Sequence, residues 1–123
     1  MRKIVLIGGV LLLAACYGGG GKGVAQIPAL MSPSGMANQE AANKNNEGVD
    51  HLVQGHYDVA GPLFQQAVAA QPDFAEAQFN LGVALDGKGD HAGATEAFKK
   101  ASEFGKNNPK IAENEILKKH LGM

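Results

Sequence analysis

An internal repeat with a period of 34 residues constrains the fold more than any other feature of this sequence. Small or aromatic residues recur five times at this one offset. The pairs are Gly48 and Gly82, Gly55 and Gly89, Ala60 and Ala94, Phe64 and Phe98, and Ala67 and Ala101. Periods of roughly 20–50 residues are typical of repeat proteins, whose units stack and share one continuous core. The chain is therefore expected to contain two copies of one supersecondary unit.

Each copy has the pattern of a helical hairpin. Phe64 and Ala67 follow Ala60 at i+4 and i+7, which places the three on one apolar stripe of a helix. Glycine inside a helix costs about 1 kcal/mol relative to alanine, so Gly48 and Gly82 need a compensating contact. Close approach of the paired helices supplies it, with Ala60 and Ala94 as the small residues opposite the glycines.

The period and the motifs resemble those of the tetratricopeptide repeat family. The second copy, which carries the resemblance best, reads AEAQFNLGVALDGKGDHAGATEAFKKA. The resemblance implies an all-α domain over residues 37–123, with repeat 1 at 41–74, repeat 2 at 75–108 and a capping helix at 109–121. Two hairpins and a cap make five expected helices. The residues expected to pack the repeats are Gly48, Ala60, Phe64, Ala67, Gly82, Ala94, Phe98 and Ala101.

In this family the first helix of each repeat lines a concave groove that binds a peptide or a helix. Carried over position by position, the expected groove residues are Asn45, Asn46, Val49, Glu76, Phe79, Asn80 and Val83. Asparagine side chains can bond a peptide backbone while the apolar side chains form pockets. The alternative is that Val49 and Val83 simply face the neighbouring helix.

The first sixteen residues resemble a bacterial lipoprotein signal peptide. Arg2 and Lys3 precede an uncharged stretch from Ile4 to Ala15, which is shorter than the roughly 20 residues that a membrane span needs. Leu13-Ala14-Ala15-Cys16 matches the lipobox at all four positions. The resemblance implies removal of residues 1–15 and a diacylglyceryl group on Cys16, with no other cofactor. The alternative is an ordinary secretory signal peptide in which Cys16 is not modified by lipid.

A glycine- and proline-rich stretch at residues 16–36 separates the lipobox from the repeats. Such a composition predicts a flexible tether. Within it, Ile27 to Met31 forms a small apolar island, which is either inert or docks as an extended peptide on the domain or on a partner.

Other chemistry finds little support in the sequence. The glycines after Cys16 lack the residues of a phosphate-binding loop, and Asp86 to Asp90 lacks the ligands of a calcium loop. A single cysteine excludes an internal disulfide, and a net charge of −1 gives no reason to expect nucleic acid. His56 and His91 fall at equivalent inter-helix loops, which leaves a weak alternative of a shared metal site. No catalytic constellation stands out, so no enzyme is expected.

The sequence therefore predicts a lipid-anchored adaptor that binds another envelope protein through its groove. Tyr17 after Cys16, in place of Asp, favours the periplasmic face of the outer membrane by the usual sorting rule of Gram-negative bacteria. Two repeats are fewer than the three or so that a stable array needs, so a self-associating structural module is the alternative.

Overall fold

The computed structural model describes residues 26–123, and the regular secondary structure within them is helical. The expected signal peptide at 1–15, the lipobox with Cys16, and the start of the expected tether lie outside the described residues. From residue 26 onward, none of the helices combines the length and apolar character that a membrane crossing requires.

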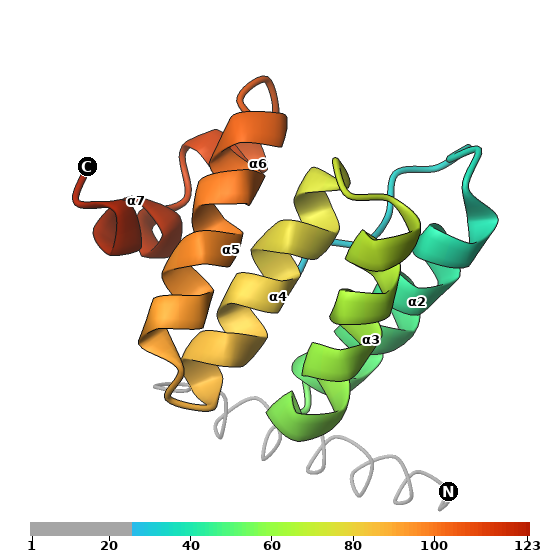
Figure 1. The fold of residues 1–123 in the computed structure, drawn as a ribbon, viewed down its shortest axis with the longest axis horizontal. Helices are drawn as coiled ribbons and strands as arrows, with labels where there is room; N and C mark the ends of the chain where they lie inside the picture. Colours follow the sequence, from blue (N-terminus) through green and yellow to red (C-terminus); the bar gives the residue numbers. More distant parts are fainter. Residues whose placement is uncertain (1–25) are drawn as a thin grey trace, which may run out of the picture.

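Two antiparallel helical hairpins stand side by side, and two short helices close the C-terminal end (Figure 1). The first hairpin pairs α2 (Gln39–Leu52) with α3 (Tyr57–Ala70), and the second pairs α4 (Ala75–Gly87) with α5 (His91–Phe104). Helix α3 packs on α4, which joins the hairpins, and α7 packs on α5. The second hairpin lies within predicted repeat 2, and the first begins at Gln39, two residues before the predicted start of repeat 1. The all-α fold expected from the 34-residue period is confirmed.

Equivalent turns join the two helices of each hairpin. Gly55 and Gly89 both adopt a left-handed backbone, with φ of 79° and 88°, a conformation that side chains disfavour. After the second turn, Asp90 caps α5 by accepting a hydrogen bond from the Gly93 N–H at 2.8 Å. Recurrence of one turn at one offset explains why the two hairpins have similar shapes.

The recurrent phenylalanines lie directly on the recurrent glycines. A Cβ atom on Gly48 would lie 2.6 Å from the ring of Phe64, and one on Gly82 would lie 2.6 Å from the ring of Phe98. Both rings are fully buried. The prediction of close helix packing at the glycines therefore holds, but an aromatic ring rather than an alanine occupies the space above each one.

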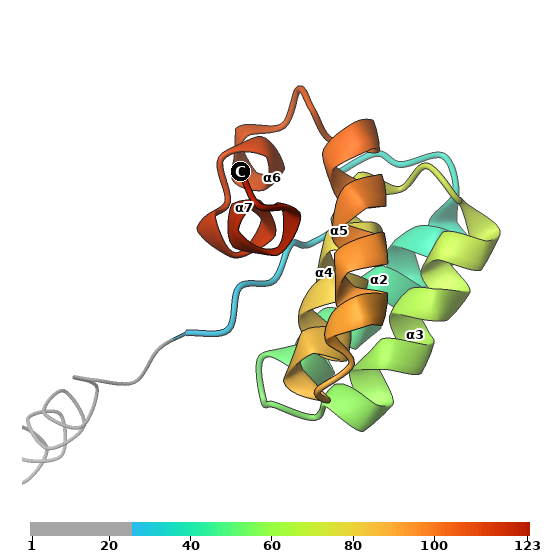
Figure 2. The same ribbon diagram turned by 60° about the vertical axis from the view of Figure 1, so that its left-hand side comes forward.

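The C-terminal cap is two helices, so the expectation of one helix over 109–121 is wrong. Helix α6 spans Pro109–Ala112 and α7 spans Glu115–Leu121 (Figure 2). The break occurs because Asn114 takes an extended conformation and accepts hydrogen bonds from the N–H groups of Ile116 and Leu117, which starts a new helix. The break lets Ile111 and Leu117 both enter the core.

The glycine–phenylalanine contact makes a testable prediction. Gly82→Ala should destabilise the protein by about 1–3 kcal/mol through overpacking, although alanine is intrinsically the better helix former by about 1 kcal/mol. Phe98→Leu removes the ring and should lower the cost of Gly82→Ala in the double variant. Urea unfolding of the four proteins of this cycle measures the coupling. Additive costs would contradict the packing described here.

Candidate functional site

The candidate site is the face of α2 and α4 that carries Asn45, Asn46 and Asn80, hereafter the A-helix face. Asn46 and Asn80 are 34 residues apart and hold equivalent places in the two repeats. Asn45 and Asn80 are fully buried, which is unusual for an amide and requires that their polar atoms find partners. The partners come from the chain itself.

Residues 27–32, hereafter the docked segment, cross the A-helix face before the chain turns into α2 (Figure 2). The Leu30 N–H donates to Asn80 Oδ1 at 2.8 Å, and the Ser32 N–H donates to Asn46 Oδ1 at 2.8 Å. Backbone groups two residues apart thus meet equivalent asparagines of successive repeats. Met31 between them is 55% exposed, so its side chain lies away from the A-helix face.

The carbonyl of Leu30 completes the polar network. It accepts hydrogen bonds from Asn80 Nδ2 at 2.8 Å and from Asn45 Nδ2 at 3.0 Å. Asn80 Nδ2 also donates to Asn45 Oδ1 at 2.8 Å, and Asn45 Nδ2 also donates to Ser32 Oγ at 3.0 Å. Each side-chain amide nitrogen carries two hydrogens. All four hydrogens, two on Asn45 and two on Asn80, therefore have an acceptor.

Apolar contacts hold the docked segment as well. Ile27, Ala29 and Leu30 pack on the core cluster that contains Val49 and Val83, which are 6% and 7% exposed. An extended backbone held by amides over an apolar floor is the chemistry expected of a groove that binds peptides.

The groove prediction therefore needs correction in one respect. The predicted residues do come together, but the chain covers them, so they do not form an open groove. Phe79 is fully buried, and its ring lies 5.6 Å from that of Phe98 between centroids, which makes it a core residue. Glu76 lies at the margin, where its carboxylate accepts a hydrogen bond from Asn108 Nδ2 at 3.1 Å.

The expected tether is corrected likewise, since its described part includes a segment bound to the domain. Of the two readings of the island from Ile27 to Met31, docking on the domain is the one that the structure bears out. Ser32 is the contact residue that sequence reasoning missed. The one feature of the sequence that could have indicated Ser32 is its position two residues after Leu30. In an extended chain, backbone N–H groups two residues apart point the same way.

Part of the site remains open beside the docked segment. A hollow of about 440 Å³ is lined by Ala29 to Pro33 on one side and by Glu76, Asn108 and Lys110 on the other. It exposes one side of the segment to solvent.

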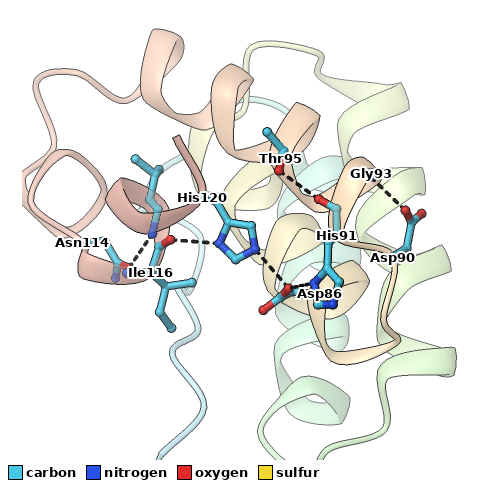
Figure 3. A network of polar contacts seen from close by, with 9 residues as sticks. Asp86, Asp90, His91, Gly93, Thr95, Asn114, Ile116 and His120 are labelled. Carbon is cyan, nitrogen blue, oxygen red and sulfur yellow. Dashed lines mark hydrogen bonds and ion pairs between the residues drawn. The ribbon is translucent and has the colours of Figure 1, made fainter. Parts of the chain in front are cut away.

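His56 and His91, the pair considered for a metal site, have different histidine neighbours in the structure. The ring of His56 lies 5.8 Å from that of His51, whereas His91 lies beside Asp86 and His120 (Figure 3). Burial raises the pKa of the Asp86 carboxyl, but hydrogen bonds and positive charge from His91 and His120 outweigh it and hold that pKa below its usual 3.8. Among the described residues, the group of possible metal ligands that the fold brings together around His91 contains Asp86 and His120, and His56 is not part of it.

Comparison with known families agrees with the geometry. The tetratricopeptide repeat model matches residues 45–109, which is more than half of the chain. The protein belongs to the tetratricopeptide repeat family. Comparison with curated proteins and with solved structures finds no significant match. Members of this family generally mediate protein–protein interaction, and the fold is typically a non-catalytic interaction module.

A matched pair of substitutions tests the role of the asparagines. Asn80→Asp replaces a donor to the Leu30 carbonyl by a second acceptor, whereas Asn46→Asp keeps the oxygen that accepts from Ser32. An orphaned buried group costs about 1–3 kcal/mol, so the Leu30 amide in Asn80→Asp should exchange its hydrogen at least about tenfold faster.

The measurement is amide hydrogen exchange by NMR. Asn46→Asp carries the same added charge and should leave the exchange of Leu30 within about twofold of the parent. Equal acceleration in both variants would mean that charge, and not the lost donor, releases the segment.

Proposed function

We propose that this protein is a lipid-anchored adaptor of the bacterial envelope that binds an extended segment of another envelope protein on its A-helix face. The observation that carries the proposal is the pair of buried amides at Asn45 and Asn80, which bind the backbone of Leu30 on both its N–H and its C=O. These contacts recognise the backbone, so any extended chain with a suitable apolar side chain can make them.

The docked segment then acts as an internal competitor. When it leaves, Asn45 and Asn80 lose partners for three of their four amide hydrogens, together with the acceptor bond to the Leu30 N–H. Buried polar groups without partners are costly, so the site favours replacement of one extended chain by another over an empty state. A partner binds only those molecules in which the segment has left the A-helix face. Its apparent affinity is therefore the intrinsic affinity multiplied by the fraction of molecules with the segment undocked.

The location of the adaptor is proposed from the lipobox resemblance. Leu13-Ala14-Ala15-Cys16 supports removal of residues 1–15 and acylation of Cys16, and two or more acyl chains give stable membrane anchoring. Tyr17 supports the periplasmic face of the outer membrane of a Gram-negative bacterium. The docked segment begins only eleven residues after Cys16, so the anchor and the segment lie close along the chain.

The anchor has a simple test. Cys16→Ser should abolish lipid labelling and move the protein from the membrane fraction to the soluble fraction, because serine cannot accept the thioether-linked diacylglyceryl group. Cell fractionation with labelled fatty acid measures both effects. A serine variant that stays membrane-bound and labelled would contradict the lipobox assignment.

Partner binding on the A-helix face is tested by two substitutions with opposite expected effects. Leu30→Ser weakens the docked segment and should raise the amount of partner captured by crosslinking in the native envelope. Asn80→Asp weakens the face itself and should abolish capture, while Asn46→Asp, which retains the acceptor oxygen, should preserve it. If Leu30→Ser lowers capture as Asn80→Asp does, the segment is not a competitor.

A self-associating structural module is the second candidate. The array has two repeats, and Phe104 at the end of α5 is 43% exposed beside an open hollow of about 320 Å³ that Phe74 and Met36 also line. A second copy packed there would extend the short array. Sedimentation of the purified protein separates the candidates, since a strict monomer at tens of micromolar would count against self-association.

A further inference from the structure

Three potential metal ligands converge at the end of the second hairpin, far along the chain from the docked segment. Asp86 lies in the last turn of α4, His91 begins α5 and His120 lies on α7 (Figure 3). The carboxylate Oδ1 of Asp86 lies 2.5 Å from His91 Nδ1 and 3.0 Å from His120 Nε2. The three ligand atoms all lie within 4.8 Å of one another. No function described above uses them.

The hydrogen bonds of His120 orient its ring and direct Nε2 at the Asp86 carboxylate. Its Nδ1 lies 3.0 Å from the backbone carbonyl of Ile116, and a carbonyl can only accept, so Nδ1 carries the proton. In the neutral imidazole, Nε2 then presents its lone pair to the Asp86 carboxylate, which also only accepts. Two acceptors face each other at 3.0 Å, and only a proton or a metal ion between them makes the contact favourable.

We propose that Asp86, His91 and His120 form a zinc-binding site. Imidazole nitrogens and a carboxylate oxygen are common Zn²⁺ ligands, and three protein ligands leave a fourth position for water or for a group from a partner. The bond from His120 Nδ1 to a backbone carbonyl is the contact that fixes the ring of a metal-binding histidine and directs Nε2 at the ion.

The dimensions are close to those required. Ligand atoms at the corners of a tetrahedron around Zn²⁺ are about 3.3 Å apart, given bonds of about 2.0–2.1 Å. To reach this spacing, the Asp86 oxygen must move away from each nitrogen by less than about 1 Å, and the histidine nitrogens, within 4.8 Å of one another, must approach by up to about 1.5 Å. His91 can adjust because its side chain is 73% exposed, whereas His120 is 15% exposed and its ring packs on Phe98 with centroids 4.8 Å apart.

A positively charged side chain lies beside the proposed site. Lys119 and Ile116 line the same open hollow of about 310 Å³ as the three ligands. A lysine ammonium opposes a dication, so Lys119→Met should strengthen zinc binding a fewfold. The ligands come from three helices, so the ion would bind only when α7 is docked and would hold the C-terminal cap on the second repeat.

The experiment uses the full chain in detergent with Cys16→Ser throughout, because the lone cysteine is itself a zinc ligand. Competition of Zn²⁺ with a chromophoric chelator should give one ion per chain. His91→Ala should weaken binding at least about tenfold without loss of fold, since the side chain is exposed, and His120→Ala should weaken it more. Saturating Zn²⁺ should raise the thermal midpoint of the parent by at least about 5 °C.

Matched controls separate this site from general histidine binding. His56→Ala removes another exposed histidine and should leave zinc affinity unchanged, whereas Lys119→Met should raise it. Binding that survives His91→Ala, or that His56→Ala weakens equally, would overturn the proposal. No binding at about 100 μM Zn²⁺ would also overturn it, and would mean that a proton alone bridges His120 and Asp86.

Discussion

The amide–amide contact between Asn45 and Asn80 is the interaction on which the functional face depends. It joins the first helices of the two repeats through a buried hydrogen bond of 2.8 Å. Buried amides need partners for every N–H, and the helices alone supply only this one bond between them. The other three amide N–H groups need acceptors that lie across both helices. The carbonyl of Leu30 and the hydroxyl of Ser32 supply them, and the Leu30 N–H donates in return to Asn80.

This requirement links the fold to the proposed function. The glycine–phenylalanine contacts bring the helices of each hairpin together, and the packing of α3 on α4 sets α2 and α4 side by side. Equivalent residues of successive repeats then recur at a spacing that matches alternate residues of an extended chain. The face binds backbone because of this match, and the chain occupies its own face because a suitable segment, residues 27–32, precedes α2 by a short connection.

The sequence predicted the scaffold well because its signals are local and repeated. The turn glycines and the glycine–phenylalanine contacts each act within one hairpin, and the 34-residue offset repeats them in the second, so a single sequence displays them directly. The split of the cap depended on whether Asn114 would start a new helix or continue one, and neighbouring residues do not decide that. In the structure Asn114 starts a new helix by accepting from the N–H groups of Ile116 and Leu117, and Ile111 and Leu117 are both buried.

The occupied state of the A-helix face was harder to predict because it depends on contacts across 50 residues between Leu30 and Asn80. The asparagines were singled out by repeat position, and the apolar island by composition, but nothing in the sequence joined the two. The same holds for His120 and Asp86, which lie 34 residues apart and meet only because α7 folds back on α5. Polar pairings of this kind follow from tertiary geometry rather than from local pattern.

The most direct test of the account is an NMR measurement of nuclear Overhauser effects in the isotopically labelled protein. The account predicts cross-peaks between the backbone amide of Leu30 and the side-chain amide protons of Asn80, whose oxygen accepts its hydrogen bond at 2.8 Å. If Leu30 instead shows cross-peaks only to its sequence neighbours, with random-coil chemical shifts, the segment does not occupy the A-helix face and the central claim is contradicted.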